Sequence, residues 1–185
     1  MQLESLDLAL TTPRLRLRPL SQADADAIWP WVSDPELPRQ MTWNAHKDRS
    51  ETLAFLRRTE AALADGTSVV WGIVHEGTLC GAIGLHDITW HWFAWRMDRA
   101  ELGYWIGPPF QGRGLATEAA RAVLDFAFTT LRLHKVTVGC FDENAASRRV
   151  IEKLAFRYCG TRRDHAFKDD RWHHHRDYEL LEQDR

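Results

Sequence analysis

Residues 100–131 contain the feature that most constrains the fold: a strand-like run, a loop with two glycines and a long amphipathic helix follow one another directly. The run AELGYWI (100–106) is mostly apolar and ends at Gly107-Pro108-Pro109. From Leu115 to Leu131, apolar residues recur at helical spacing. The loop between them supplies consecutive backbone N–H groups at a helix start, where they lack partners and the dipole is positive. This order predicts an anion site in a mixed α/β fold.

The glycines of this loop indicate which anion it holds. Gly112 and Gly114 allow close backbone approach and positive φ angles, which suits a phosphate. The nucleotide-triphosphate loop requires a lysine, and none is present here. The dinucleotide fingerprint requires a small residue where Thr117 stands and an acidic residue near the position of Arg132. A loop whose glycines only turn the chain remains an open alternative.

The remaining patterns predict a single α/β domain over residues 1–185. Strand patterns cover 11–20, 68–75, 79–88, 135–141 and 171–181, and the second and third form a hairpin across Glu76-Gly77. Helix patterns cover 21–29, 50–65 and 144–154. Ser21 with Asp24 forms a capping box, Pro30 or Pro35 ends that helix, and Ser50 caps the next one. The length suits one domain.

Composition excludes several classes of protein. With 44% hydrophobic and 27% charged residues the chain is globular, and it contains no apolar run long enough to span a membrane. A net charge of −2 argues against nucleic-acid binding. The N-terminus lacks a signal-peptide pattern, so we expect a cytoplasmic protein. Cys80, Cys140 and Cys159 share no metal or disulfide spacing, and His173 with His175 alone is a weak metal motif, so we expect no metal.

At the glycine loop the chain resembles the GCN5-related N-acetyltransferases, the GNAT superfamily. Gln111-Gly112-Arg113-Gly114-Leu115-Ala116 matches the family's pyrophosphate loop, Gln/Arg-x-x-Gly-x-Gly/Ala, at every fixed position. The opening segment 12–18, the strand 100–107 and the segment 144–156 resemble the RimJ/RimL branch, which acetylates the N-termini of ribosomal proteins. The resemblance implies a mixed central sheet of about seven strands with splayed central strands, flanked by about four helices. It also implies acetyl-CoA as co-substrate.

The resemblance assigns residues to the co-substrate. The expected contacts to coenzyme A (CoA) are Trp105, Ile106, Gln111, Gly112, Arg113, Gly114, Leu115, Ala116, Thr117, Asn144 and Ser147. Candidates for the 3′-phosphate are Arg113, Arg121, Arg148, Arg149 and Lys153, with solvated helix charges as the alternative reading. Asn144 and Ser147 also suit a helix N-cap.

The catalytic candidates are Glu101 as base and Ser147 as donor to the departing sulfur. Glu101 could equally be a strand carboxylate paired with an arginine. Asp164 and His165 are reserve bases. Some relatives carry a glutamate where Gly139 stands and a tyrosine where Ile151 stands, so that acid–base pair is absent here.

The expected acceptor is a protein or peptide N-terminal α-amine, which attacks directly in a ternary complex. An α-amine has a pKa near 8, so deprotonating it costs ~3 kcal/mol less than deprotonating a lysine. Aromatic residues proposed for the acceptor pocket are Trp43, Trp90, Trp92 and Trp95, although the last three also fit an extended strand packed on the core.

Two other functions stay open. A polyamine or aminoglycoside acceptor would seek the carboxylates Asp24, Asp26, Asp34 and Glu36. The second open function is a non-catalytic module that binds CoA without transferring an acetyl group. The sequence leaves the oligomeric state open.

Overall fold

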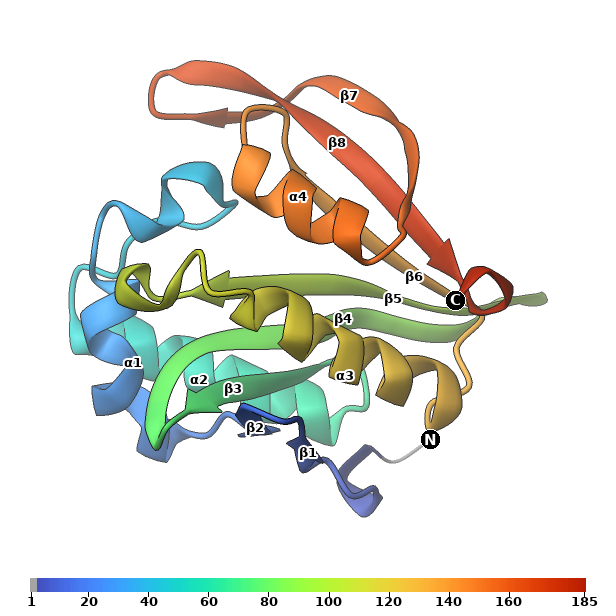
Figure 1. Cartoon of the computed structure of the whole chain (residues 1–185), viewed down its shortest axis with the longest axis horizontal. Helices are drawn as coiled ribbons and strands as arrows, with labels where there is room; N and C mark the ends of the chain where they lie inside the picture. Colours follow the sequence, from blue (N-terminus) through green and yellow to red (C-terminus); the bar gives the residue numbers. More distant parts are fainter. Residues whose placement is uncertain (1–2) are drawn as a thin grey trace.

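The computed structural model describes residues 3–185, which form one eight-stranded sheet covered by helices on both faces (Figure 1). The strand order is β1-β2-β3-β4-β5-β6-β8-β7, and every neighbouring pair is antiparallel except β5 and β6. The strands are β1 Leu10–Thr11, β2 Leu15–Pro19, β3 Val69–His75, β4 Thr78–Trp92, β5 Trp95–Ile106, β6 Lys135–Phe141, β7 Arg157–Lys168 and β8 Arg171–Leu181. The α-helices are α1 Ala25–Val32, α2 Arg49–Ala64, α3 Leu115–Thr129 and α4 Ala145–Lys153.

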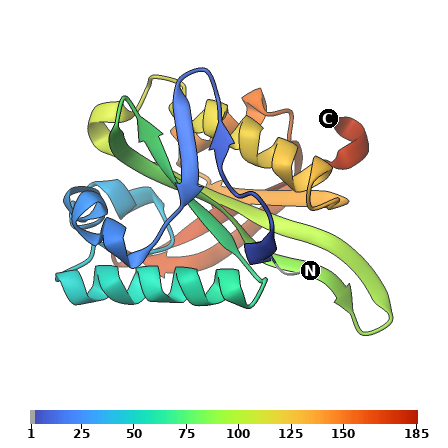
Figure 2. The ribbon, with the colours of Figure 1, turned by 90° about the horizontal axis from the view of Figure 1, so that it is seen from below.

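The helices divide between the two faces, as Figure 2 shows. α1 and α2 pack on one face through Ile28, Val32 and Leu56. On the other face α3 buries a stripe that includes Val123, and Phe126 packs edge-on against Trp71. Each face thus has its own apolar core, and the sheet lies between the two.

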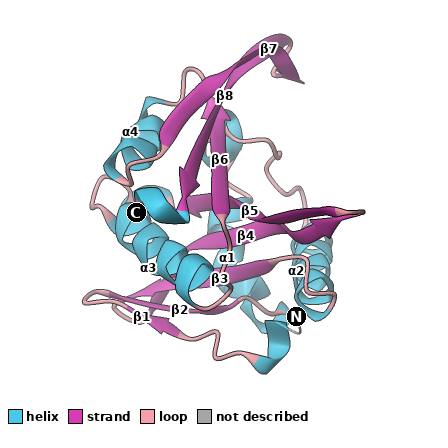
Figure 3. Ribbon diagram, turned by 90° about the vertical axis from the view of Figure 1, so that its right-hand side faces the viewer, coloured by secondary structure: helices cyan, strands magenta, loops and turns pink. Residues whose placement is uncertain are grey.

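The central strands separate part-way along their length. β5 and β6 pair only from Arg99–Lys135 to Glu101–Thr137 and then diverge, while β6 remains paired with β8 along its whole length. Figure 3 shows β6, β7 and β8 turned away from β5. The splay implied by the resemblance is therefore confirmed, and it opens the sheet beside residues 102–106.

Most predicted elements are present, and the sheet has one strand more than the seven expected. Two strands were not predicted. One is β7, an exposed edge strand whose polar sequence gives no alternating pattern, and the other is β1, because the single strand predicted over 11–20 is divided into β1 and β2. α1 does not end at Pro30: it continues to Val32, and the Ser33 N–H donates to Trp29 O at 3.1 Å. The N-cap of α2 is Asp48 rather than Ser50, since the Asp48 carboxylate accepts from the backbone N–H of Ser50.

Among residues 3–185, no helix is both long enough and apolar enough to cross a bilayer.

Candidate active site

The splay creates a cleft of about 1620 Å³ between the two halves of the sheet. β4 and β5 form one wall, and β6, α4 and β8 form the other. The lining also includes the glycine loop before α3 and the segment around Trp43, with Phe55 of α2. One cleft therefore connects an anion-binding helix start to a partly aromatic region.

The glycine loop has the geometry of an anion site. Gly112 and Gly114 adopt φ angles of +72° and +79°, in the left-handed region that favours glycine. The first helical bond of α3 runs from the Glu118 N–H to Gly114 O at 3.1 Å, so the N–H groups of residues 115–117 precede it. The Gln111 amide donates to Ile106 O at 2.9 Å and ties the loop to the end of β5.

Most residues expected to contact CoA line this cleft. They are Trp105, Ile106, Gln111, Gly112, Leu115, Ala116, Asn144 and Ser147. Gly114 belongs to the loop but not to the lining, and Thr117 is a buried residue of α3 that is also outside the lining. The Arg113 side chain turns the other way, with Nη2 3.2 Å from His75 Nε2. Arg113 is therefore outside the cleft lining, and its side chain contacts β3 instead.

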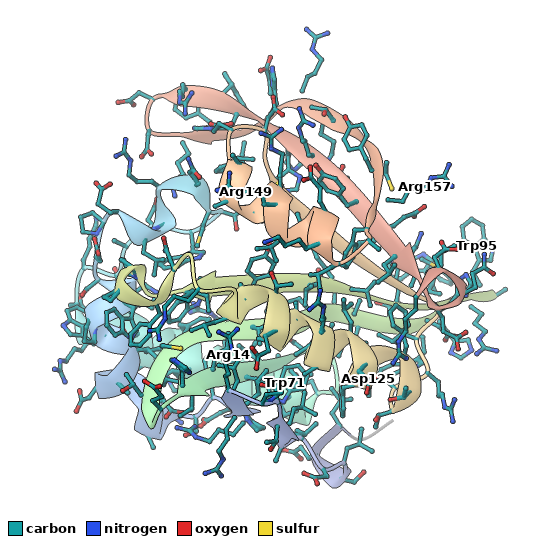
Figure 4. All side chains as sticks on the ribbon, viewed as in Figure 1. Arg14, Trp71, Trp95, Asp125, Arg149 and Arg157 are labelled. Atoms are coloured by element: carbon teal, nitrogen blue, oxygen red, sulfur yellow. The ribbon has the colours of Figure 1, made fainter. Side chains whose placement is uncertain are left out.

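Two basic residues of α4 line the cleft beside the loop. They are Arg149, labelled in Figure 4, and Lys153. Arg121 and Arg148, also candidates for the 3′-phosphate, are not part of the lining. Of the candidates for the 3′-phosphate, Arg149 and Lys153 are thus the ones whose residues line the cleft.

Asn144 and Ser147 connect α4 to both walls. Asn144 Oδ1 accepts from the Ser147 N–H at 2.9 Å, which is the N-cap contact, and Asn144 Nδ2 donates to Gln40 O at 3.1 Å. Ser147 Oγ lies 2.9 Å from Tyr104 Oη, so this pair bridges the splayed strands. Sequence reasoning missed Tyr104 because its partner lies 43 residues away.

Tyr104 stays protonated across the physiological range. Burial, partly offset by the hydrogen bond with Ser147, raises the pKa of Tyr104 to about 12. The phenol is therefore a proton donor at neutral pH.

Two titratable residues of neighbouring strands line the cleft opposite α4. Glu101 of β5 pairs in register with His86 of β4, and both belong to the lining. Enclosure by the cleft walls and the nearby Asp87 carboxylate raise the pKa of Glu101. Burial lowers the pKa of His86, with Asp87 opposing it. Sequence reasoning missed His86 because it lies within the predicted strand 79–88 and no motif surrounds it.

The reserve bases lie outside the cleft lining. Asp164 contacts His174, with 3.3 Å between Oδ1 and Nδ1, and His165 Nε2 lies 2.8 Å from an Arg162 nitrogen. A different histidine of this hairpin, His175, lines the cleft and contacts Asp177 at 3.0 Å. The hairpin thus presents His175, not the two predicted residues, to the cleft.

The four tryptophans proposed for the acceptor pocket separate in the structure. Trp43 lines the cleft, whereas Trp90, Trp92 and Trp95 do not. β4 and β5 remain paired out to Trp92–Trp95, so their hairpin extends to the far end of the molecule, where Figure 4 labels Trp95. Trp92 and Trp95 are 61% and 71% exposed, while Trp90 packs against the core. Strand pairing along the hairpin therefore keeps these three residues away from the cleft.

Residues 37–43, between α1 and α2, contact the N-cap of α4 and strand β7; we call this segment the strap. Lys168 of β7 donates to three strap carbonyls, those of Pro38, Met41 and Trp43, at 2.6, 2.9 and 2.6 Å. Burial lowers the pKa of Lys168. Together with the bond from Asn144 to Gln40, these contacts bridge the cleft.

Comparison with known proteins agrees with this arrangement. Residues 14–157 match the family model described as an acetyltransferase (GNAT) domain. The putative ribosomal N-acetyltransferase YdaF of Bacillus subtilis is 34% identical over 122 residues, covering 65% of this chain and 63% of that protein. Spermidine N(1)-acetyltransferase of Escherichia coli is 41% identical over 58 residues, 31% of each chain.

A solved structure shares the fold across almost the whole chain. RimL, a ribosomal alpha-N-protein acetyltransferase crystallised with coenzyme A, superposes with a TM-score of 0.86 at 16% identity, covering 96% of this chain and 99% of RimL. The splayed strands, the glycine loop at the start of α3 and the family match lead to one conclusion: the chain belongs to the GNAT family of acetyl-CoA-dependent N-acetyltransferases.

Proposed function

We propose that this protein transfers the acetyl group of acetyl-CoA to the N-terminal α-amine of a peptide or protein. The observation that carries the proposal is the single cleft, which runs from the glycine loop to the region around Trp43 and passes the Tyr104–Ser147 pair on the way. A donor and an acceptor can meet there only if they enter from different directions.

The donor half of the cleft fits CoA. Gly112 and Gly114 adopt left-handed angles at the start of α3, where the backbone N–H groups of 115–117 precede the first helical bond. An ideal Cβ on Gly112 would meet no atom within 4 Å, which leaves room for a phosphate. Arg149 and Lys153 supply positive charge beside it. The pantetheine arm would lie along residues 102–106, where β5 has no strand partner on the β6 side.

The reaction needs a proton removed from the amine and a proton supplied to sulfur. The acceptor nitrogen forms a bond to the acetyl carbon, the C–S bond breaks, and the thiolate leaves. Tyr104 and Ser147 form a hydroxyl pair on the donor side of the cleft, so either hydroxyl can donate to the sulfur while the other replaces the proton. This assigns Ser147 the donor role expected from the sequence, shared with Tyr104.

A peptide N-terminus fits the acceptor half best. The strap leaves a narrow route bounded by Trp43, Phe55 and Met41, which suits an extended and partly apolar chain. The names of YdaF and RimL point to the same class of acceptor.

A polyamine is the second candidate, because a segment of the chain is similar to spermidine N(1)-acetyltransferase. The carboxylates Glu36, Glu101 and Asp169 line the cleft and would attract it. Two of the carboxylates proposed for this role are engaged elsewhere: Asp24 pairs with Arg18 and Asp26 pairs with Arg49.

The test is thiol release from acetyl-CoA with a panel of acceptors: peptides beginning with Ala, Ser or Met, the same peptides with a blocked N-terminus, spermidine and an aminoglycoside. Turnover confined to peptides with a free N-terminus supports the proposal. Turnover of spermidine or the aminoglycoside with inactive peptides would replace it by a small-amine function. Tight CoA binding with no turnover across the panel contradicts acetyl transfer to these acceptors and favours a CoA-binding module.

A further inference from the structure

His86 occupies a recess in the cleft that two glycines create. Its side chain lies above Gly84 of its own strand and Gly103 of β5, which are register partners. An ideal Cβ would stand 2.9 Å from the His86 Nε2 atom at Gly84 and 3.3 Å from it at Gly103. A Cβ at Gly84 would force the ring to move, and a Cβ at Gly103 would press against it, so the two glycines make room for the imidazole.

The hydrogen bonds of Ser68 fix which ring nitrogen of His86 carries the proton. Ser68 Oγ donates its single hydrogen to Leu85 O at 2.9 Å. Its oxygen must then accept at its other contact, 3.0 Å away, which is His86 Nδ1. Neutral His86 is therefore protonated on Nδ1, and Nε2 keeps a free lone pair on the cleft side.

The surroundings keep this imidazole neutral at pH 7. Burial lowers the pKa of His86, and the Asp87 carboxylate opposes that effect without cancelling it. The other charged or titratable residues that line the cleft are Glu36, Arg39, His46, Arg58, Glu101, Tyr104, Cys140, Arg149, Lys153, Asp169, Arg171 and His175.

We propose that His86 Nε2 is the base that takes the proton from the acceptor nitrogen as it attacks the acetyl carbon. The lone pair of the amine nitrogen forms the new C–N bond, and the C–S bond breaks with its electron pair going to sulfur. The proton lost by nitrogen ends on His86, the N–H electron pair stays on the amide nitrogen, and sulfur receives a proton from the Tyr104–Ser147 pair. This inference rests on the proposed acetyl transfer and names the residue that serves it.

The other candidates are less suited to the role. His175 Nδ1 lies 3.0 Å from both Asp177 Oδ1 and Arg162 Nη2, so its tautomer is not fixed, and the guanidinium opposes a positive charge on the ring. A carboxylate is ordinarily a weaker base than a neutral imidazole, and the lining of the cleft gives Glu101 another role. Its carboxylate, across from His86, can instead hold an incoming ammonium group.

The test compares His86→Gln with His91→Gln, an exposed histidine further along β4 that is outside the cleft lining. With the acceptor that the wild type uses, His86→Gln should lower kcat/KM about 100-fold or more at pH 7, while His91→Gln leaves it unchanged. The acidic limb of the wild-type pH profile should be lost in His86→Gln. Calorimetric CoA affinity should stay at the wild-type value, which shows that the variant is folded.

A second variant makes the test independent of packing. Added imidazole should raise the residual rate of His86→Ala at least about 10-fold, and this increase should depend on pH. If wild-type turnover is robust and His86→Gln retains it with the same pH profile, the base assignment fails while acetyl transfer stands. If the wild type itself acetylates no acceptor, the proposed function fails first.

Discussion

At the scale of the residue, Gly114 and Gly77 offer a matched pair. Both adopt a φ of +79°, and both have open surroundings for a Cβ: nothing lies within 4 Å at Gly77, and only the end of Arg14, 3.6 Å away, is near at Gly114. Gly77 lies in the turn between β3 and β4, and Gly114 immediately precedes α3. Substitution should therefore impose a similar backbone strain at each position.

We expect Gly114→Val to lose CoA affinity by at least about 10-fold and Gly77→Val to keep it, with a similar loss of stability of about 1–2 kcal/mol in each. Calorimetry with CoA and urea unfolding measure the two quantities. Unchanged affinity in Gly114→Val would exclude the glycine loop as the phosphate site.

The Tyr104–Ser147 pair supports a second prediction at this scale. Because each hydroxyl contacts the other at 2.9 Å, removing one leaves the second without its partner. Tyr104→Phe and Ser147→Ala should each lower kcat about 10-fold or more, and the double variant should be little worse than the poorer single one. Additive losses in a double-mutant cycle would show that the two hydroxyls act separately.

At the scale of the element, Glu118 links the first strands to the start of α3. Its carboxylate accepts from Thr12 Oγ1 at 2.6 Å, from the Arg14 N–H at 3.0 Å and from Arg14 Nε at 2.6 Å. Arg14 also donates to Arg113 O at 3.1 Å, which ties β2 to the glycine loop. Figure 4 shows Arg14 beneath this loop.

These bonds make the stability depend on pH. Burial acts to raise the pKa of Glu118, but the bonds from Thr12 and Arg14 outweigh it and hold the pKa below its usual value. A folded-state pKa below the unfolded one stabilises the fold above the unfolded pKa, about 4.3, and this contribution disappears as pH falls through the folded pKa.

Glu118→Gln should therefore lower the free energy of unfolding by about 1–2 kcal/mol at pH 7. The difference in this free energy between the variant and the wild type should shrink below pH ~4. Urea unfolding at both pH values measures it. Glu152→Gln, at an exposed carboxylate on α4, is the control and should change little. A difference that stays constant with pH would mean that the charge of Glu118 is not the cause.

The elements that could be predicted are those whose residue pattern lies within one continuous stretch of sequence. β6 and β8 have the predicted bounds 135–141 and 171–181 because alternating apolar residues end at turns. The glycine loop was equally accessible, since seven consecutive residues define it. β7 was missed because it buries too little to alternate.

The acceptor half of the site was less accessible to sequence analysis. His86 depends on Ser68, Gly84 and Gly103, which come from different segments, and the Tyr104–Ser147 pair joins a strand to a helix. The tryptophan-rich insert had the composition of a pocket wall, but strand register placed it elsewhere. Contacts between segments, unlike local patterns, require the fold to be known.

At the scale of the whole molecule, the strap is the direct side-chain link across the splay on the acceptor side. Lys168→Met keeps the aliphatic stem but removes the three bonds to the strap. We expect the acceptor KM to rise about 10-fold while CoA affinity stays within about twofold, because the donor half is held by other contacts. Steady-state kinetics and calorimetry measure the two effects. Arg163→Met, at an exposed position of the same strand, is the control. An unchanged acceptor KM would show that the strap does not shape the acceptor route.

The strap also makes the cleft a ring of polypeptide closed by hydrogen bonds rather than an open trough. A ring admits a chain that has a free end, whereas the middle of a long chain can enter only if the ring opens. A closed ring would thus accept a chain terminus more readily than an interior loop, whatever the side chains of the acceptor.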